Sequence, residues 1–283
     1  MARLMNPHNG GSSLPRAPGP DRRRAVLILG GVVVLVLALL VGLVVSVTNL
    51  FGPDEPGDRG PGASSPGPGA GSGGSGRQAE AGLARQPMLD VPINAVSPHT
   101  LSTRTAGPLI TLPEPEQVTG ALVATGFDDS EEGALAQLAE LTKAGLSGGD
   151  PQTWARVYQS LAEPGAAPPG QTRVHRDLVD LRRGANLAST GPLRAGMTMS
   201  WTPTSAMVKG STAEGTYLVA CVLGEFVADN KGRVVTAGWG NCLPMRRVGD
   251  QWRIASGPTA APAPSAWPGS DEAVAAGWRD IAR

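Results

Sequence analysis

A run of uncharged residues, Ala25–Val47, constrains this chain more than any other feature of its sequence. As an α-helix rising about 1.5 Å per residue it would be roughly 34 Å long, enough to cross a hydrocarbon core of about 30 Å. The alternative is a cleaved signal peptide, which has a shorter apolar region followed by a small-residue cleavage site. Residues 46–50 offer no such site. The sequence therefore predicts an uncleaved transmembrane helix.

Arg22, Arg23 and Arg24 directly precede this run and predict its orientation, because positively charged flanks remain in the cytoplasm. The first 24 residues hold five arginines and one aspartate, a net charge of +4. The whole chain is neutral, so the remainder carries −4. We expect a single-pass protein of the cell membrane, in contact with the lipid bilayer, with its N-terminus in the cytoplasm. The acidic external part disfavours direct binding of nucleic acid.

Composition divides the chain into five parts. Residues 52–77 contain 19 Gly, Pro or Ser among 26 positions, and such segments bury too little apolar surface to fold. Residues 78–117 place short apolar groups among prolines, which indicates an extended arm partly packed on the domain. The predicted parts are a basic cytoplasmic tail (1–24), a transmembrane helix (25–47), a disordered linker (48–77), an extended arm (78–117) and an extracytoplasmic domain (118–283).

Three helices are predicted at the start of the domain. Ser130 can cap the first, which has two glutamates in its first turn, where carboxylates suit the helix dipole. Asp150 and Pro151 form a start signal for the second, because a capping side chain is followed by proline at the first helical position. The third carries apolar residues at helical spacing from Val174 and ends near Gly184.

Strands follow the helices. From Met197 to Trp201 apolar and polar residues alternate, which is typical of a half-buried strand. Longer strands are predicted over Tyr217–Val227 and Val234–Val248, joined by a tight turn in which Gly232 supplies a positive φ. Gln251–Ile254 is expected to be the last strand of this meander. The sequence therefore predicts an α+β domain with three helices packed on a curved antiparallel sheet.

This order of elements resembles the cystatin-like cone fold, also called nuclear-transport-factor-two-like, and Val248–Ile254 resembles its final hairpin. Anchored proteins of this build include assembly factors of type IV secretion and conjugation machines. The domain also resembles actinobacterial membrane proteins of conjugative plasmids and integrative elements. The segments that carry this likeness are Gly126-Phe127, Glu132-Gly133-Ala134-Leu135, the two cysteines, Trp252-Arg253-Ile254 and Pro262-Ala263-Pro264-Ser265-Ala266-Trp267-Pro268. The resemblance implies a non-enzymatic scaffold in a DNA-transfer apparatus, with other membrane proteins of that complex as partners and a homo-oligomer left open.

A second function stays open from the same resemblance. Accessory subunits of actinobacterial lipid importers also join an N-terminal anchor to a cone domain, which implies an extracytoplasmic ligand-binding module. The genes beside this one would separate the two hypotheses. A DNA-translocating ATPase would favour transfer, and lipid-import genes would favour the accessory module.

Cys221 and Cys242 lie in adjacent predicted strands. If the hairpin folds symmetrically about Lys231 and Gly232, they face each other, and a non-hydrogen-bonded pair has Cα atoms about 4.5 Å apart, within disulfide range. A register shifted by two residues would make them diagonal neighbours, and two reduced buried thiols are the other alternative. Because disulfides persist outside the cytoplasmic membrane, we predict one between Cys221 and Cys242.

The sequence shows no clear pattern for catalysis, a metal or a cofactor. Its glycines form no phosphate-binding or dinucleotide-binding motif, and the cysteines lack metal-ligand spacing. The groups that a cone-fold enzyme could use are Tyr158, His175, Asp177 and Asp180. His175 and Asp177 lie two positions apart on a predicted helix and point in different directions, so an ion-paired surface is expected. We predict neither an enzyme nor a cofactor, and identify no small-molecule substrate.

All six tryptophans lie in the predicted external domain. We expect them mainly in the core, and the alternative is an aromatic mouth that receives a peptide, a lipid or a partner helix. Ser270 is expected to cap a last helix that runs through Trp278 to Ile281. We expect that helix to pack against the sheet, and the alternative is a docking stripe that would make Trp267 and Trp278 a partner surface.

Overall fold

The computed structural model describes residues 73–117, 122–212 and 215–282. The predicted tail, the predicted transmembrane helix and most of the predicted linker, with Arg22, Arg23 and Arg24, lie outside these residues. Within the described part, no helix is both long enough and apolar enough to cross a membrane. The fold below is that of the predicted external part.

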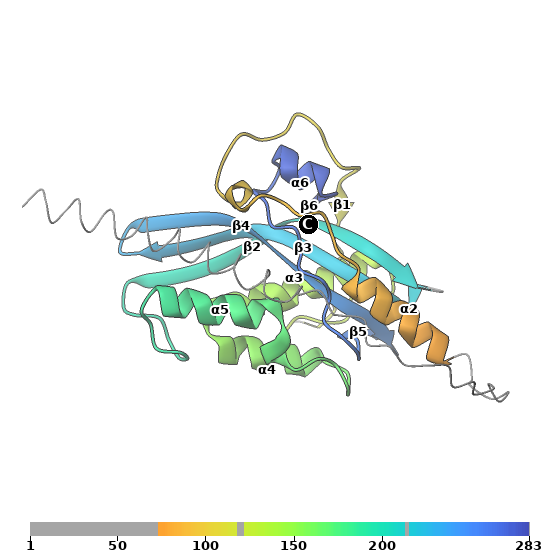
Figure 1. The fold of residues 1–283 in the computed structure, drawn as a ribbon. Helices are drawn as coiled ribbons and strands as arrows, with labels where there is room; N and C mark the ends of the chain where they lie inside the picture. The colour runs from red at the N-terminus through yellow and green to blue at the C-terminus, as the bar shows by residue number, and fades with distance from the viewer. Residues whose placement is uncertain (1–72, 118–121, 213–214, 283) are drawn as a thin grey trace, which may run out of the picture. The chain divides into compact units, whose positions relative to one another are not determined.

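The described residues form an α+β domain with a curled six-stranded sheet (Figure 1), and the predicted fold class is confirmed at this level. The helices are α2 (Gly73–Arg85), α3 (Glu131–Leu146), α4 (Pro151–Leu161), α5 (Arg173–Gly184) and α6 (Asp271–Ala275), with 3-10 turns η1 (Ile93–Val96), η2 (Ser147–Gly149) and η3 (Pro169–Gln171). The strands are β1 (Ile110–Thr111), β2 (Met197–Thr212), β3 (Tyr217–Asn230), β4 (Arg233–Val248), β5 (Gln251–Ile254) and β6 (Arg279–Ala282).

Polar side chains cap the three helices that pack on the sheet. The Ser130 hydroxyl accepts a hydrogen bond from the Gly133 N–H at 2.9 Å, and the Asp150 carboxylate accepts one from the Gln152 N–H at 3.0 Å. Both predicted caps are confirmed, because each side chain pairs a backbone donor that the helix itself leaves unpaired. Thr172 caps α5 in the same way, which the sequence did not reveal to us.

The sheet has the strand order β1-β6-β2-β3-β4-β5, and its centre is the long antiparallel set β2, β3 and β4. The predicted turn between β3 and β4 is confirmed, with φ of 54° at Lys231 and 84° at Gly232. Because both residues have positive φ, the twist of the turn matches the twist of the flanking strands. β2 continues to Thr212, past the predicted alternating segment, and a register shift lies between Pro203 and Ser205.

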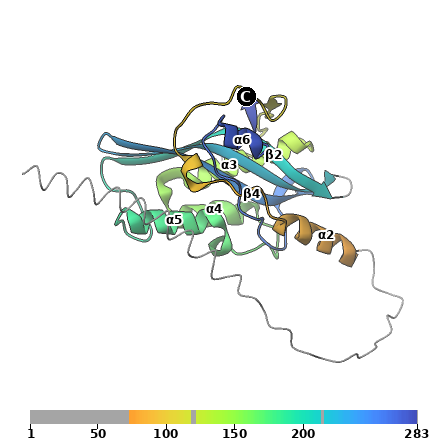
Figure 2. The ribbon, with the colours of Figure 1, turned by 45° about the horizontal axis from the view of Figure 1, so that its top comes forward.

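Both faces of the sheet are covered (Figures 1 and 2). Helices α3, α4 and α5 lie on one face, where a large apolar cluster includes Trp154, Trp201 and Trp252. The arm and the C-terminal segment (residues 255–278), which contains α6, lie on the other face. They surround a second cluster that includes Tyr217 and Trp278. β3 supplies alternate residues to both clusters, so it is the most enclosed strand.

The predicted boundary between linker and extended arm is wrong, because α2 runs through it from Gly73 to Arg85. The glycines at its start made this segment resemble a linker, but a short helix-forming stretch follows them. Leu83 and Ala84 of this stretch pack in the second cluster. The rest of the arm is mainly extended, as predicted. Ile110 and Leu112 are buried, which confirms its partial packing on the domain.

The predicted last helix is also wrong beyond its cap. The Ser270 hydroxyl does accept a hydrogen bond from the Ala273 N–H at 3.2 Å. However, α6 ends at Ala275, and Gly277 follows with a φ of 92°. The chain then forms β6, which pairs with β1 and β2. The hydrogen bonds of β6 with two strands therefore favour an extended conformation over the helix that the sequence pattern predicts for these residues.

Candidate functional site

The predicted disulfide joins Cys221 and Cys242, which lie opposite each other in β3 and β4 with their Cα atoms 4.1 Å apart. The register confirms that the hairpin is symmetric about Lys231 and Gly232. Both cysteines are buried, and the Met88 sulfur contacts Cys242 Sγ at 3.7 Å. The arm therefore covers the disulfide, which makes it a structural link in the domain.

Trp278 packs into the domain, as expected, and the alternative of a partner surface at this residue is wrong. Its side chain is only 3% exposed, and its indole N–H donates to the Pro264 carbonyl at 2.9 Å. Trp278 directly precedes β6, and the pairing of β6 with the sheet places the Trp278 side chain in the second cluster. Trp267 is half-buried, and its backbone N–H donates to the Ala95 carbonyl at 2.6 Å. Both tryptophans thus hold the C-terminal segment on the domain.

The four groups considered for catalysis lie in separate surroundings, and His175 is half-buried on α5. The Tyr158 hydroxyl donates to the Ala167 carbonyl at 2.9 Å, and burial raises the pKa of Tyr158 to about 12. Its phenol is therefore neutral at physiological pH. Asp180 pairs with Arg183 at 2.8 Å on the outer surface of α5.

Asp177 has a structural environment. Its Oδ2 accepts hydrogen bonds from Arg173 Nε at 3.2 Å and from Trp239 Nε1 at 2.8 Å. Arg173 also donates to the Ala263 carbonyl at 2.7 Å. These contacts join α5, β4 and the C-terminal segment. The expectation of an ion-paired face around Asp177 is confirmed by the first of them.

Side chains fill the space between the helices and the sheet. Trp154 and Trp252 are almost fully buried there, and each indole N–H has a partner, the Thr172 hydroxyl and the Asp128 carbonyl respectively, both at 2.8 Å. In the described part of the chain, the hollows that we find lie outside this core. The candidate site therefore lies at the surface.

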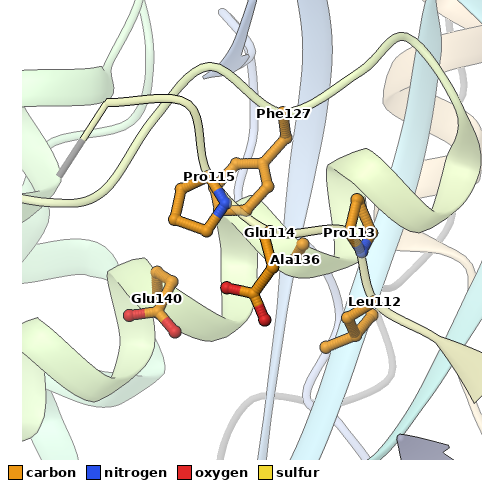
Figure 3. Close-up of a pocket in the computed structure, with 7 residues that line it drawn as sticks. All are labelled: Leu112, Pro113, Glu114, Pro115, Phe127, Ala136 and Glu140. Atoms are coloured by element: carbon orange, nitrogen blue, oxygen red, sulfur yellow. The ribbon is translucent and has the colours of Figure 1, made fainter. Parts of the chain in front are cut away.

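The candidate site is a small, shallow hollow where the arm crosses α3 (Figure 3). It is lined by Leu112, Pro113, Glu114, Pro115, Phe127, Ala136 and Glu140. Figure 3 shows the carboxylates of Glu114 and Glu140 on the same side of the hollow, with Pro115 and Phe127 beside them. We call this set of residues the acidic hollow.

Local contacts fix the walls of the acidic hollow. The Leu112 N–H donates to the Ala282 carbonyl at 3.0 Å, so the arm extends the sheet beside β6. The Phe127 side chain is buried, and its carbonyl accepts from Arg247 Nη1 at 2.8 Å. Because both walls are tied to strands, the hollow is preformed rather than dependent on a partner.

The acidic hollow lies in the most acidic part of the folded chain. Residues 105–150 contain eight Asp or Glu residues and one base, Lys143. Lys143 Nζ lies 3.9 Å from Glu140 Oε2. Glu114, on the arm, is exposed. An apolar floor with two carboxylates suits the side chain of Arg or Lys, whose aliphatic stem contacts apolar groups while its charge meets the carboxylates. This site was not predicted from the sequence, although the charge bias of residues 105–150 was a usable signal.

Comparisons of this chain with known protein families, with curated proteins and with solved structures find no match.

Proposed function

We propose that this protein is a membrane-anchored, non-enzymatic scaffold of a conjugative DNA-transfer apparatus, similar to type IV secretion. In this proposal the helix over residues 25–47 anchors the chain, and the α+β domain is a cystatin-like cone outside the membrane. The acidic hollow is its docking site for a partner protein. The occupant is a lysine or arginine side chain on an extended segment of another membrane component.

The acidic hollow is the observation that carries this proposal. Glu114 is exposed on the arm, Glu140 faces it from α3, and the half-buried Pro115 lies beside them over the buried Phe127. Charged groups of one sign select a partner of the other sign and speed its encounter. The surrounding excess of acids extends this preference over a wider surface.

Because its interior is filled, the domain fits the function of a scaffold better than that of an accessory module of a lipid importer. A lipid or similar ligand needs an enclosed apolar cavity of several hundred Å³. In the described residues the corresponding space of the cone is occupied by the core around Trp154 and Trp252. A partner on the outside fits this arrangement better than a ligand inside.

A complementation experiment tests the proposal. Deletion of the gene should abolish DNA transfer and leave growth intact, and the wild-type gene should restore transfer. Glu114→Lys should lower transfer at least tenfold at equal protein level, because it places a positive charge in the acidic hollow. Asp250→Lys is the matched control, since it makes the same charge change at an exposed turn.

Two outcomes would count against the proposal. Undiminished transfer after deletion would refute the role in transfer, and a loss of lipid uptake in the same strain would support the accessory module instead. Normal transfer with Glu114→Lys would refute the acidic hollow as the docking site. The two results are independent.

A further inference from the structure

The outer edge of β4 is a second surface that the acidic hollow does not explain. β4 pairs with β5 only over Met245–Val248, so among the described residues no strand pairs with its outer edge from Arg233 to Leu243. An unpaired edge presents backbone N–H and C=O groups to any strand that reaches it. Proteins usually block such edges, and this domain blocks most of its own.

Three other edges of the sheet are protected. β1 has only two residues. β5 is covered by the segment after α4, through bridges of Ala162 to Ile254 and of Ala166 to Gly257. The outer edge of β2 carries Pro203 and a register shift beside it. Short strands, proline and bulges are known ways to prevent pairing at an edge.

The middle of β4 is covered by the C-terminal segment. The Ser265 hydroxyl accepts a hydrogen bond from the Gly240 N–H at 3.1 Å. At Gly238, a side-chain Cβ would overlap the Ala266 carbonyl. This cover stops before Val234 and Val235, which are 58% and 60% exposed. The stretch Val234–Ala237 contains no charge, proline or bulge, and we call it the open edge.

The register shows which backbone groups the open edge presents. Cys221 and Cys242 have Cα atoms 4.1 Å apart, the spacing of a non-hydrogen-bonded pair. Every second residue of β4 from Cys242 therefore turns its N–H and C=O away from β3, as the Gly240 N–H confirms by its bond to Ser265. Val234 and Thr236 have the same parity. Their backbone groups consequently point outward on either side of Val235.

We propose that the open edges of two copies of this chain pair antiparallel across a two-fold axis at Val235. Val234 of each copy then lies opposite Thr236 of the other, and these pairs exchange their N–H···O=C bonds. The two Val235 side chains meet on the helix-covered side of the sheet. β-branched residues on paired strands pack well against each other.

The open edge is uncharged, so it offers a charged foreign strand no complementarity, whereas a second copy of the chain is anchored in the same membrane. The outward groups of Val234 and Thr236 flank Val235 evenly, so the segment can pair with itself about Val235. A C2 interface requires this self-complementarity. The seam is short, so its strength depends on the local concentration that a shared membrane provides, and this step rests on the proposed anchor. Membrane fractionation reports the anchor separately from the pairing.

Cysteine cross-linking of the full chain in its own membrane tests the register. Val235→Cys places two thiols across the axis, and mild oxidation should link the copies. Val234→Cys is an equally exposed neighbour that faces the opposite side of the sheet, and should give at least fivefold less linked dimer. Equal linking at both positions, or none at either, would overturn the proposal, as would linking of Val235→Cys to a different protein.

A charge substitution gives a second test that needs no new thiol. Val235→Lys places like charges opposite each other across the axis and should lower energy transfer between two fluorescent fusions of the full chain at least fivefold. Val248→Lys adds the same charge to an exposed position at the other end of β4 and should leave energy transfer unchanged. Unchanged transfer with Val235→Lys would contradict pairing at the open edge.

Discussion

Glu80 and Arg246, which are 166 residues apart in the chain, form a two-pronged ion pair with N–O distances of 2.9 and 2.8 Å. Arg246 also contacts Glu163 at 3.3 Å and lies 5.2 Å above the ring of Tyr217. The pair joins α2 to β4 and to the end of α4. The segment that follows the predicted linker is thus fastened to the sheet, and a force on an anchor would reach the domain through α2.

Glu80→Gln should loosen α2 from the sheet. Both partners are largely shielded from solvent, with 16% and 25% of their side chains exposed, so loss of one charge weakens a paired contact. We expect about 1–2 kcal/mol less protection of the α2 amides. Hydrogen exchange of the Gln86 amide, which bonds to the Gly82 carbonyl, measures this. Glu131→Gln on α3 is the control, and equal protection in all three proteins would contradict the role of this pair.

The disulfide should resist alkylation in the native protein. Intact mass after treatment with a thiol reagent should show no label without reductant, and two labels after reduction and unfolding. Reduction should cost roughly 3 kcal/mol, because the bond closes a loop of 21 residues. Chemical unfolding with and without reductant measures this difference. Labelling of both Cys221 and Cys242 without reductant would show that they are not bonded.

His99 holds the arm against α6 in a pH-dependent way. Its ring bonds to the Ser97 carbonyl at 2.7 Å and to Glu272 at 3.0 Å, and these two contacts, in that order, raise the pKa of His99 above 6.5. A raised pKa in the folded state stabilises docking below about pH 6.5, and this contribution is lost as the pH rises through the folded-state pKa. The pKa values of Asp271 and Glu272 are lowered, mainly by hydrogen bonds from Ser102 and from His99 respectively, so their contribution is lost in acid.

The docked segment should therefore be most protected between about pH 4.5 and 6.5. The Ser102 N–H, which bonds to the Gly269 carbonyl at 2.7 Å, is a suitable reporter. Its protection factor, corrected for intrinsic exchange, should fall between pH 5.5 and pH 8. His99→Gln should remove this fall. A pH response that persists in that variant would place its origin in another group.

Thr172→Val should destabilise the domain by about 2–3 kcal/mol. The Thr172 hydroxyl accepts from Trp154 Nε1 at 2.8 Å in the core and from the His175 N–H at 3.3 Å as the cap of α5. Valine has the same shape but leaves both donors unpaired. Thr153→Val, on the outer side of α4, should change stability by less than about 0.5 kcal/mol. Urea unfolding of both variants gives the comparison, and equal effects would contradict the argument.

Local signals predicted much of the fold. The caps at Ser130 and Asp150, the alternation from Met197 and the turn at Gly232 are each determined by residues close in sequence. The disulfide was predictable for the same reason, because a symmetric hairpin fixes which residues of β3 and β4 face each other. Short-range rules suffice where the chain pairs with its immediate neighbour.

Contacts between distant segments could not be predicted in this way. β6 depends on β1, which lies about 170 residues earlier, and this pairing competes with the helical pattern around Trp278. α2 begins among glycines and is stabilised by packing of Leu83 and by Arg246. The acidic hollow likewise forms only when the arm at Glu114 meets α3. In each case tertiary contacts decide the outcome.

The most direct test of the account is the side of the membrane on which the domain lies. Single cysteines at Ala2 and at Ala195, an exposed position between α5 and β2, can be treated with a membrane-impermeant maleimide in intact cells. The account predicts labelling of Ala195→Cys without cell lysis and of Ala2→Cys only after lysis. The reverse pattern would invert the topology and contradict the proposed extracytoplasmic scaffold.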